Sequence, residues 1–197
     1  MLGVALALAV AGCGARTTAP PGLTVTATIY PLSEFARRIA GDRAAVMVLV
    51  PPGVEAHDYE PTPKDVAALV RARLFIYNGA GFEPWVERLL PQLPAGTERV
   101  NATEGLPLVR GDGGVDPHVW LDPLLAQRQA ERILTGLVEA DPTGRSRYEA
   151  NAAAYNAKLD ALHQKYQREL QGYTKRTIVT SHAAFSYLAR RYGLEVI

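Results

Sequence analysis

The sequence predicts an α/β protein with a parallel sheet, one long helix after it, and the start of a second α/β unit. Three observations lead to this fold class. Short apolar or β-branched runs alternate with segments of helical periodicity over residues 23–140. A long segment without a helix breaker follows, at residues 145–171, and a new strand-and-helix pattern begins after Gly172. Strands that alternate with helices imply right-handed crossovers and a parallel sheet.

The first unit opens with residues 23–30, L-T-V-T-A-T-I-Y, whose alternating and β-branched side chains predict a strand. Pro31 ends that strand, and apolar residues at helical spacing then predict a helix that closes at Gly41. Residues 45–50, A-V-M-V-L-V, form a continuous apolar run, which is typical of a parallel strand buried on both faces.

A proline-rich loop after residue 50 leads to a well-marked helix start. Thr62 is the expected N-cap, Pro63 takes the first helical position, and Asp65 stands in the capping-box place. The buried stripe of this helix is expected to comprise Val66, Leu69 and Val70.

The rest of the first unit follows the same alternation. Residues 74–77, L-F-I-Y, predict a third strand, and residues 98–102 a short fourth one. Between them we expect a helix around residues 85–90, ended by prolines. Residues 105–115 are expected to be an exposed loop, and residues 123–140 to be a helix.

The long segment of residues 145–171 has an apolar stripe on a mostly polar surface. As a helix it would be about 40 Å long, which is more than one small lobe needs, so we expect a rigid spine between two lobes. Residues 176–181 then predict a strand, and residues 183–192 a helix closed by Gly193. Because the sequence stops in the next predicted strand, residues 194–197, we expect a C-terminally truncated fragment.

The N-terminus has the features of an export signal. Residues 1–11 form an apolar run of signal-peptide length, and V-A-G-C at residues 10–13 resembles the bacterial lipobox, in which the cysteine is lipidated. Cys13 is the only cysteine, so an intramolecular disulfide is excluded. The first basic residue is Arg16, so the usual positive leader is missing, and an ordinary buried helix is the alternative. We expect an exported protein with a lipid anchor at Cys13.

Four parts are therefore expected. They are a signal peptide and tether (residues 1–22), an N-terminal α/β lobe (23–144), a linking helix (145–172) and the start of a C-terminal lobe (173–197). The 197 residues are 48% hydrophobic and 21% charged, as in soluble globular proteins. With a net charge of +1 and scattered basic residues, no nucleic acid partner is expected.

One motif draws attention to metal binding. D-P-H-V-W-L-D-P, residues 116–123, places His118 between two Asp-Pro pairs. Because proline restricts its own φ and its predecessor, we expect a stiff loop, then a helix with Asp122 as its N-cap. An imidazole in a rigid loop beside carboxylates suits a metal ligand. The alternative is a surface turn with an incidental histidine.

Two further histidines share this setting. His57 and His182 follow predicted strands, and His118 precedes a predicted helix, so all three are expected in loops between strands and helices. In open α/β sheets, ligands bind in such loops at the carboxyl ends of the strands. As a set, these three histidines favour metal binding. His163 lies in the long helix and is expected to be a solvated helix residue.

Three motifs together resemble a known family. G-V-E-A-H-D-Y-E-P-T-P, D-P-H-V-W-L-D-P and T-S-H-A-A-F-S-Y-L-A-R-R-Y-G-L look like the successive ligand segments of the metal-binding (cluster A-I) solute-binding proteins of ABC transporters. That family takes up zinc or manganese. The resemblance implies two α/β lobes joined by one long helix, with the metal between them, and a membrane permease as partner. By motif position, His57, His118 and His182 would be ligands, and a fourth, Asp or Glu, would lie beyond Ile197.

The metal can be argued from the ligand type. Three neutral imidazoles suit zinc, copper or nickel, whereas manganese prefers carboxylates, and manganese members of the family tend to carry Glu in place of His182. Many zinc importers have a histidine-rich loop that residues 105–115 lack. We expect Zn(II) as the transported ligand, with Mn(II) as the alternative. Candidates for orienting the imidazoles, with capping or solvated-loop roles as equal alternatives, are Glu55, Asp58, Asp116 and Asp122.

The expected function is that of a monomeric receptor without catalysis, which captures Zn(II) outside the cytoplasm and delivers it to an ABC transporter permease. A manganese-binding member of the family, a metal-dependent adhesin and a zinc hydrolase remain alternatives. The hydrolase would need three histidines with a water in the fourth position, and a general base. The sequence lacks the H-E-x-x-H spacing of common zinc hydrolases, so an enzyme is not expected.

Overall fold

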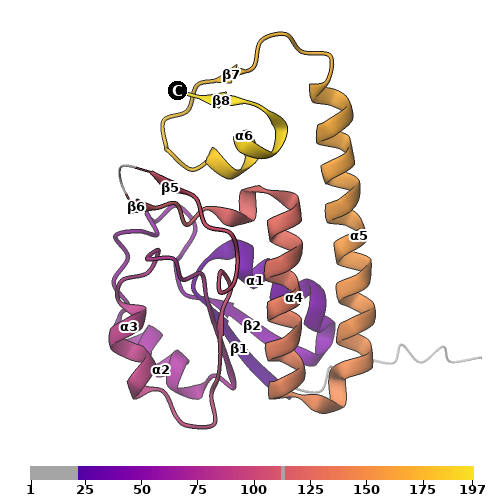
Figure 1. Ribbon diagram of the computed structural model, residues 1–197. Helices are drawn as coiled ribbons and strands as arrows, with labels where there is room; N and C mark the ends of the chain where they lie inside the picture. The colour runs from indigo at the N-terminus through magenta and orange to yellow at the C-terminus, as the bar shows by residue number, and fades with distance from the viewer. Residues whose placement is uncertain (1–21, 112–113) are drawn as a thin grey trace, which may run out of the picture.

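A four-stranded parallel sheet forms the centre of the computed structural model, which describes residues 22–111 and 114–197 (Figure 1). Its strand order is β2-β1-β3-β4. The strands are β1 (Leu23–Ala27), β2 (Ala44–Val48), β3 (Leu74–Tyr77) and β4 (Glu98–Asn101). Because β1 lies between β2 and β3, the strand order reverses there, and the loops at the carboxyl ends form the natural ligand site of such a sheet.

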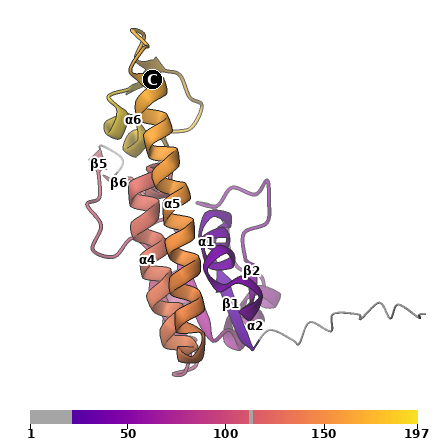
Figure 2. The ribbon, with the colours of Figure 1, turned by 90° about the vertical axis from the view of Figure 1, so that its right-hand side faces the viewer.

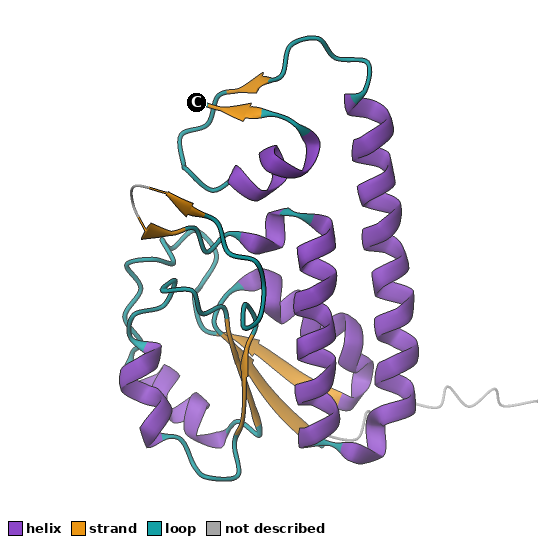
Figure 3. Cartoon of the chain, viewed as in Figure 1, coloured by secondary structure: helices purple, strands orange, loops and turns teal. Residues whose placement is uncertain are grey.

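Helices cover both faces of this sheet (Figures 1 and 3). On one face lie α1 (Tyr30–Ala40), α4 (Pro123–Ala140) and the long α5 (Arg145–Leu170), which Figure 2 shows side by side. On the other lie α2 (Pro63–Arg71) and α3 (Val86–Leu89). The predicted α/β class, with a parallel sheet and a long helix, is confirmed.

Two apolar clusters follow from the alternation of side chains along the strands. Val25 and Ile76 face the helices α1 and α4, while Phe75 faces α2 and packs with Leu69 and Trp85. These five side chains are at most 1% exposed. The central strands β1 and β3 are thus buried on both faces, which fixes the positions of the loops at their carboxyl ends.

Several helix ends have the chemistry that the sequence predicts. At α2, the hydroxyl of Thr62 accepts from the backbone N–H of Asp65, whose carboxylate in turn accepts from the N–H of Thr62. At α4, the carboxylate of Asp122 accepts from the N–H of Leu124 at 2.9 Å. Gly41, with φ of 61°, closes α1. The predicted N-caps of α2 and α4 are confirmed.

One burial prediction is wrong and a second is wrong in part. Strand β2 is not buried on both faces, because it is the edge strand of the sheet and its burial alternates; Met47 is 48% exposed. In the predicted stripe of α2, Leu69 is buried as predicted and Val66 is half-buried, but Val70 is 47% exposed and Ala68 is buried instead. An apolar run therefore marked a strand correctly but not its position in the sheet.

Residues 105–115 differ from the exposed loop that was predicted. They include a short antiparallel pair, β5 (Arg110–Gly111) and β6 (Gly114–Val115). Leu106, Leu108 and Val109 pack against a small cluster of Val119, Leu125 and Tyr187. Part of this stretch is therefore an apolar contact surface, because a later helix folds back onto it.

Helix α5 packs its first half against α1 and α4 and continues beyond them to residues 172–197, here called the C-terminal segment (Figure 1). This segment contains a short parallel pair, β7 (Thr177–Ile178) and β8 (Glu195–Val196), and helix α6 (Ser186–Tyr192). Strand β7 is shorter than the strand predicted over residues 176–181, and α6 begins three residues after the predicted helix start at residue 183. The reason is that residues 179–185 form a loop.

His163 is not the solvated residue that was predicted. Its Nδ1 atom lies 3.1 Å from the hydroxyl of Tyr192, and Tyr192 also stacks on Tyr166. This histidine therefore joins α5 to α6. The predicted boundaries between lobes stay predictions, and the predicted signal peptide, tether and lipidated Cys13 lie outside the described residues. None of the helices in the described ranges is long and apolar enough to span a bilayer.

Candidate metal site

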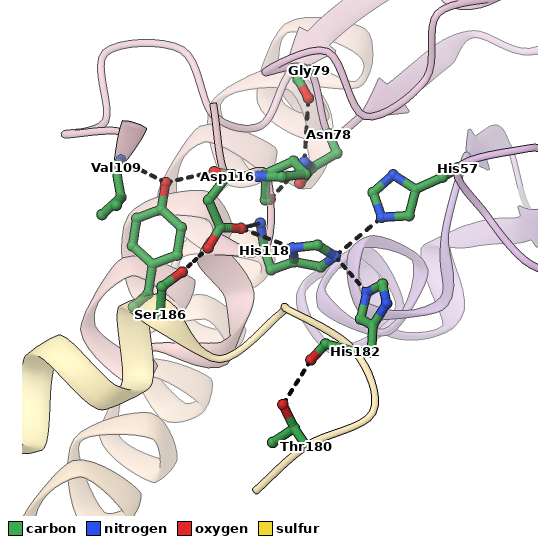
Figure 4. Close-up of polar contacts among 11 residues, drawn as sticks. His57, Asn78, Gly79, Val109, Asp116, His118, Thr180, His182 and Ser186 are labelled. Atoms are coloured by element: carbon green, nitrogen blue, oxygen red, sulfur yellow. Dashed lines mark hydrogen bonds and ion pairs between the residues drawn. The ribbon is translucent and has the colours of Figure 1, made fainter. Parts of the chain in front are cut away.

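Three histidines from distant parts of the chain meet beyond the carboxyl edge of the main sheet. His57 comes from the loop after β2, His118 from the loop before α4, and His182 from the loop between β7 and α6. The Nε2 atom of His118 lies 3.2 Å from Nε2 of His57 and 3.1 Å from Nε2 of His182 (Figure 4). Within the described residues, this is a group that could hold a metal ion, with all three nitrogens within 4.8 Å of one another.

These nitrogen separations fit a small tetrahedral cation. Zinc binds histidine nitrogen at about 2.0–2.1 Å, which places two ligand atoms of a tetrahedron about 3.3 Å apart. The separations of 3.1 and 3.2 Å are close to that value. Both contacts involve the Nε2 atom of His118, whose single lone pair can accept only one hydrogen bond, so a shared cation accounts for the two contacts together better than hydrogen bonds between the rings do.

The ring of His118 is held by Asp116 in the orientation that metal binding needs. Its Nδ1 atom lies 2.8 Å from Oδ1 of Asp116, and the same oxygen accepts from the backbone N–H of His118 at 2.9 Å. This contact assigns the ring proton to Nδ1 and leaves the lone pair of Nε2 free for a cation. With side chains 9% and 13% exposed, His118 and Asp116 form the buried end of the site.

The loop of His118 is held by buried residues at the end of β3 and in α4 that were not identified from the sequence. The side-chain amide of Asn78, at the end of β3, donates to the carbonyl of Pro117 at 2.9 Å. Asn78 in turn accepts from Gln129 of α4 at 3.2 Å. Asn78 and Gln129 are fully buried, so this connection between β3, α4 and the loop is shielded from water. A polar residue directly after a buried strand was the signal available.

Glu83 anchors the turn that follows Asn78. Its carboxylate accepts from the backbone N–H groups of Asn78 and Gly79, at 2.8 and 3.0 Å, and from the hydroxyl of Thr28. Burial raises the pKa of Glu83, while these hydrogen bonds oppose the shift. Gly79 has φ of 78° and leaves no room for a Cβ, which would lie 2.2 Å from Oδ1 of Asn101. The turn is therefore tightly specified.

Aromatic rings border the histidines on one side. The ring centroids of His57 and Phe82 lie 4.4 Å apart, and those of His118 and Trp120 lie 5.3 Å apart. Phe82 and Trp120 meet edge to face at 5.5 Å. Phe82, which is 3% exposed, was not identified from the sequence. An apolar wall lowers the local dielectric constant and limits the ways in which each imidazole can turn.

The surroundings of His57 favour its neutral form. Burial lowers the pKa of His57, and the nearby charge of His118 lowers it further, against the opposing influence of Glu55. Glu55 accepts from the backbone N–H of His57 at 3.3 Å, which lowers the pKa of the carboxyl of Glu55. A neutral imidazole is the form that binds metal, so the lowered pKa of His57 favours its binding of a cation.

The four acidic candidates differ in what they contact. Asp116 touches the ring of His118, whereas Glu55 accepts from the backbone of His57 and Ala56. For Asp58, which is exposed, the described part of the chain offers no side-chain hydrogen bond. Asp122 takes the capping role that was the alternative for it. Its carboxylate caps α4 and pairs with Arg191 of α6, and within the described residues no hydrogen bond joins it to an imidazole.

The fold and the site together define the class of metal-binding solute-binding proteins. The family model described as zinc-uptake complex component A, periplasmic (ZnuA), matches residues 25–197. The chain belongs to this family.

Individual relatives agree with this assignment. The chain is 38% identical to the high-affinity zinc uptake system protein ZnuA of Bacillus subtilis, over 96% of this chain and 66% of that protein. It is 37% identical to the manganese-binding lipoprotein MntA of Halalkalibacterium halodurans, over 98% of this chain and 66% of the relative. The Zn(II)-bound ZnuA-like domain of Streptococcus pneumoniae AdcA has a TM-score of 0.83 at 39% identity and is matched over 89% of this chain and 66% of that one. The chain thus spans just under two thirds of the length of these relatives.

Proposed function

We propose that this protein is an extracytoplasmic receptor that captures a divalent transition metal, most favourably Zn(II), and delivers it to an ABC transporter permease. The observation that supports this proposal best is the convergence of three Nε2 atoms from His57, His118 and His182. Family membership supports a role in metal uptake. The residues are proposed to bind the cation and to carry out no chemical step on it.

In this proposal, each histidine has a defined part. His118 is the fixed ligand, because Asp116 orients its ring. His57 is contributed by the loop after β2, and His182 by the C-terminal segment, so the cation would join two parts of the chain. A cation held between two parts of a chain is retained while they are together and is released if they separate.

The choice of zinc over manganese rests on the donor atoms. Imidazole nitrogen suits zinc, whereas manganese favours carboxylate and water oxygen. The relatives include proteins named for each metal, so family membership leaves both open. The three nitrogens and the separations near those of a tetrahedron favour Zn(II) for this chain.

We also propose that the protein is exported and held at the membrane by a lipid on Cys13, and that it acts as a monomer. The apolar run before Cys13 and the V-A-G-C sequence support the anchor. Mass spectrometry of the mature protein tests this part, with a diacylglyceryl group at Cys13 as the expected result. A mature protein that retains residues 1–12 would contradict it.

The main experiment compares the metals directly. The purified protein, freed of metal by chelation, is titrated with Zn(II) and with Mn(II) in competition with a chromophoric chelator. We expect one equivalent to bind, with Zn(II) preferred. A site that prefers Mn(II) would refute the zinc assignment, and a protein that binds neither would refute the proposed function. Loss of growth on limiting zinc in a strain carrying His118→Ala would connect binding to uptake.

A further inference from the structure

The C-terminal segment brings more than one residue to the site. His182 lies near the other two histidines, and four residues later Ser186 begins α6. The hydroxyl of Ser186 donates to Oδ2 of Asp116, whose other oxygen holds the ring and the backbone N–H of His118 (Figure 4). One oxygen of the Asp116 carboxylate therefore contacts His118, and the other accepts a hydrogen bond from the C-terminal segment.

The next residue holds the same loop by its backbone. The hydroxyl of Tyr187 donates to the carbonyl of Asp116 at 2.6 Å and accepts from the N–H of Val109 at 2.9 Å. Tyr187 is 3% exposed and packs with Val119 and Leu125, so its position is fixed by apolar contacts. Ser186 and Tyr187 thus hold both the side chain and the backbone of Asp116.

These contacts come from the same short segment as His182. A displacement of α6 large enough to remove His182 would also break the hydrogen bonds that Ser186 and Tyr187 make to Asp116. The carboxylate would then lose one of its two fixed partners, and the ring of His118 would turn more freely. On the other side, Asn78 would still hold the carbonyl of Pro117.

We infer that Ser186 and Tyr187 are positioning residues that couple the docking of α6 to the orientation of His118 through Asp116. The inference rests on the proposed function, because it describes how that site gains and releases its cation. Docking of the C-terminal segment adds His182 and steadies His118 at the same time. Undocking removes one ligand and weakens a second. The affinity for the cation therefore falls further than the loss of His182 alone would lower it.

The test uses Ser186→Ala, which removes the hydroxyl and leaves the helix intact. We expect Zn(II) to bind about 10-fold more weakly, the lower end of the effect of removing a partner of a metal-binding histidine. Ser186→Thr restores a hydroxyl and should recover most of the affinity. Ser146→Ala, an exposed serine in the first turn of α5, is the matched control and should bind like the wild type. Tyr187→Phe should also weaken binding, with its aromatic packing preserved.

Two further readouts separate positioning from general weakening. In an Asp116→Ala background, Ser186→Ala should cause no additional loss, because the residue through which it acts is gone. In ¹⁵N–¹H spectra of the metal-free protein, the Nδ1 proton of His118 should exchange with water faster in Ser186→Ala than in the wild type. This signal depends on the contact with Asp116 and needs no metal.

The outcomes distinguish the two proposals. A wild-type protein that does not bind Zn(II) refutes the proposed function, whereas the metal-free spectra still decide the coupling. Equal exchange rates of the Nδ1 proton in the wild type and in Ser186→Ala would overturn the inferred coupling. So would full additivity with Asp116→Ala, or a Ser186→Thr variant as weak as Ser186→Ala.

Discussion

Arg191 of α6 and Asp122 at the start of α4 form an ion pair, in which Nε and Nη2 each lie 2.8 Å from Oδ2. The side chain of Asp122 is 3% exposed, and its other oxygen accepts from the N–H of Leu124. A residue that caps one helix thus also ties a second helix to it. Together with the contacts of Asp116, this pair holds the C-terminal segment against the rest of the structure.

We predict that Arg191→Ala destabilises the protein by about 1–2 kcal/mol, because the buried, charged carboxylate of Asp122 then keeps one hydrogen-bond partner in the described part of the chain, the N–H of Leu124. The exposure of Arg191 keeps the effect below that of a fully buried pair. Urea unfolding measures the difference. Arg190→Ala is the control, since Arg190 is exposed on the same helix, and a change within about 0.5 kcal/mol is expected there.

Replacing any one of His57, His118 or His182 by alanine should weaken Zn(II) binding by more than about 100-fold, because a direct ligand contributes more than its supporting contacts do. Competition titration measures the change. His163→Ala removes a histidine that contacts Tyr192 of α6 instead, so it acts only through the docking of α6 and its effect should be much smaller than that of the other three variants. A fully retained affinity in one of the three variants would exclude that histidine as a ligand.

Zinc affinity should fall as the pH is lowered below about 6.5, because protonated imidazole cannot bind a cation. The pKa of His57 is lower in the folded protein, through burial first and then repulsion by His118. The unfolded chain therefore binds more protons at this position, so the metal-free protein also loses stability as the pH falls through that window. Titrations and unfolding curves at pH 7.5, 6.5 and 5.5 test both trends. A flat affinity across them would contradict imidazole ligation.

Asp141 should be a strong contributor to stability where α4 ends. Burial would raise its pKa, but hydrogen bonds from Thr143, Tyr148 and Arg43 outweigh that effect and hold it well below its usual range. The contribution is present above the ordinary aspartate pKa and is lost as the pH falls below about 3.9. We expect Asp141→Asn to lower the free energy of unfolding by about 1–3 kcal/mol at pH 7, as measured by urea unfolding.

The control for this prediction is Asp160→Asn. Asp160 is exposed on α5, where, among the described residues, its carboxylate accepts a hydrogen bond from Gln164, four residues later. Such a pair on a helix surface contributes about 0.2–0.5 kcal/mol. An equal loss of stability in both variants would mean that the contacts of Asp141 contribute no more to the free energy of unfolding than a pair on a helix surface does.

Gly136 should resist replacement, although alanine is the better helix former. A Cβ at this position of α4 would lie 2.3 Å from Cγ2 of Val100 and 3.2 Å from Cδ1 of Leu74. Overpacking costs about 1–3 kcal/mol, which exceeds the gain of about 1 kcal/mol in helix propensity. We expect Gly136→Ala to lower the midpoint of thermal unfolding. Gly96→Ala, with open space around it, should not, and a more stable Gly136→Ala would show that α4 can move away from the sheet.

The sequence by itself determined the features that depend on near neighbours. The capping box of Thr62 and Asp65, the cap of Asp122 on α4 and the length of α5 all follow from residues within a few positions of one another. Histidines placed after strands, together with the order of the motifs, were enough to select His57, His118 and His182. Local chemistry and topology rules decide these matters before any packing is known.

Only the tertiary structure decided which partners these residues have. Nothing near Ser186 in the chain indicates that it meets Asp116, seventy positions earlier, or that Arg191 meets Asp122. The edge position of β2 is equally invisible to its apolar sequence. The physical reason is that such contacts depend on the docking of whole elements, and many pairings of similar elements are compatible with one pattern of apolar residues.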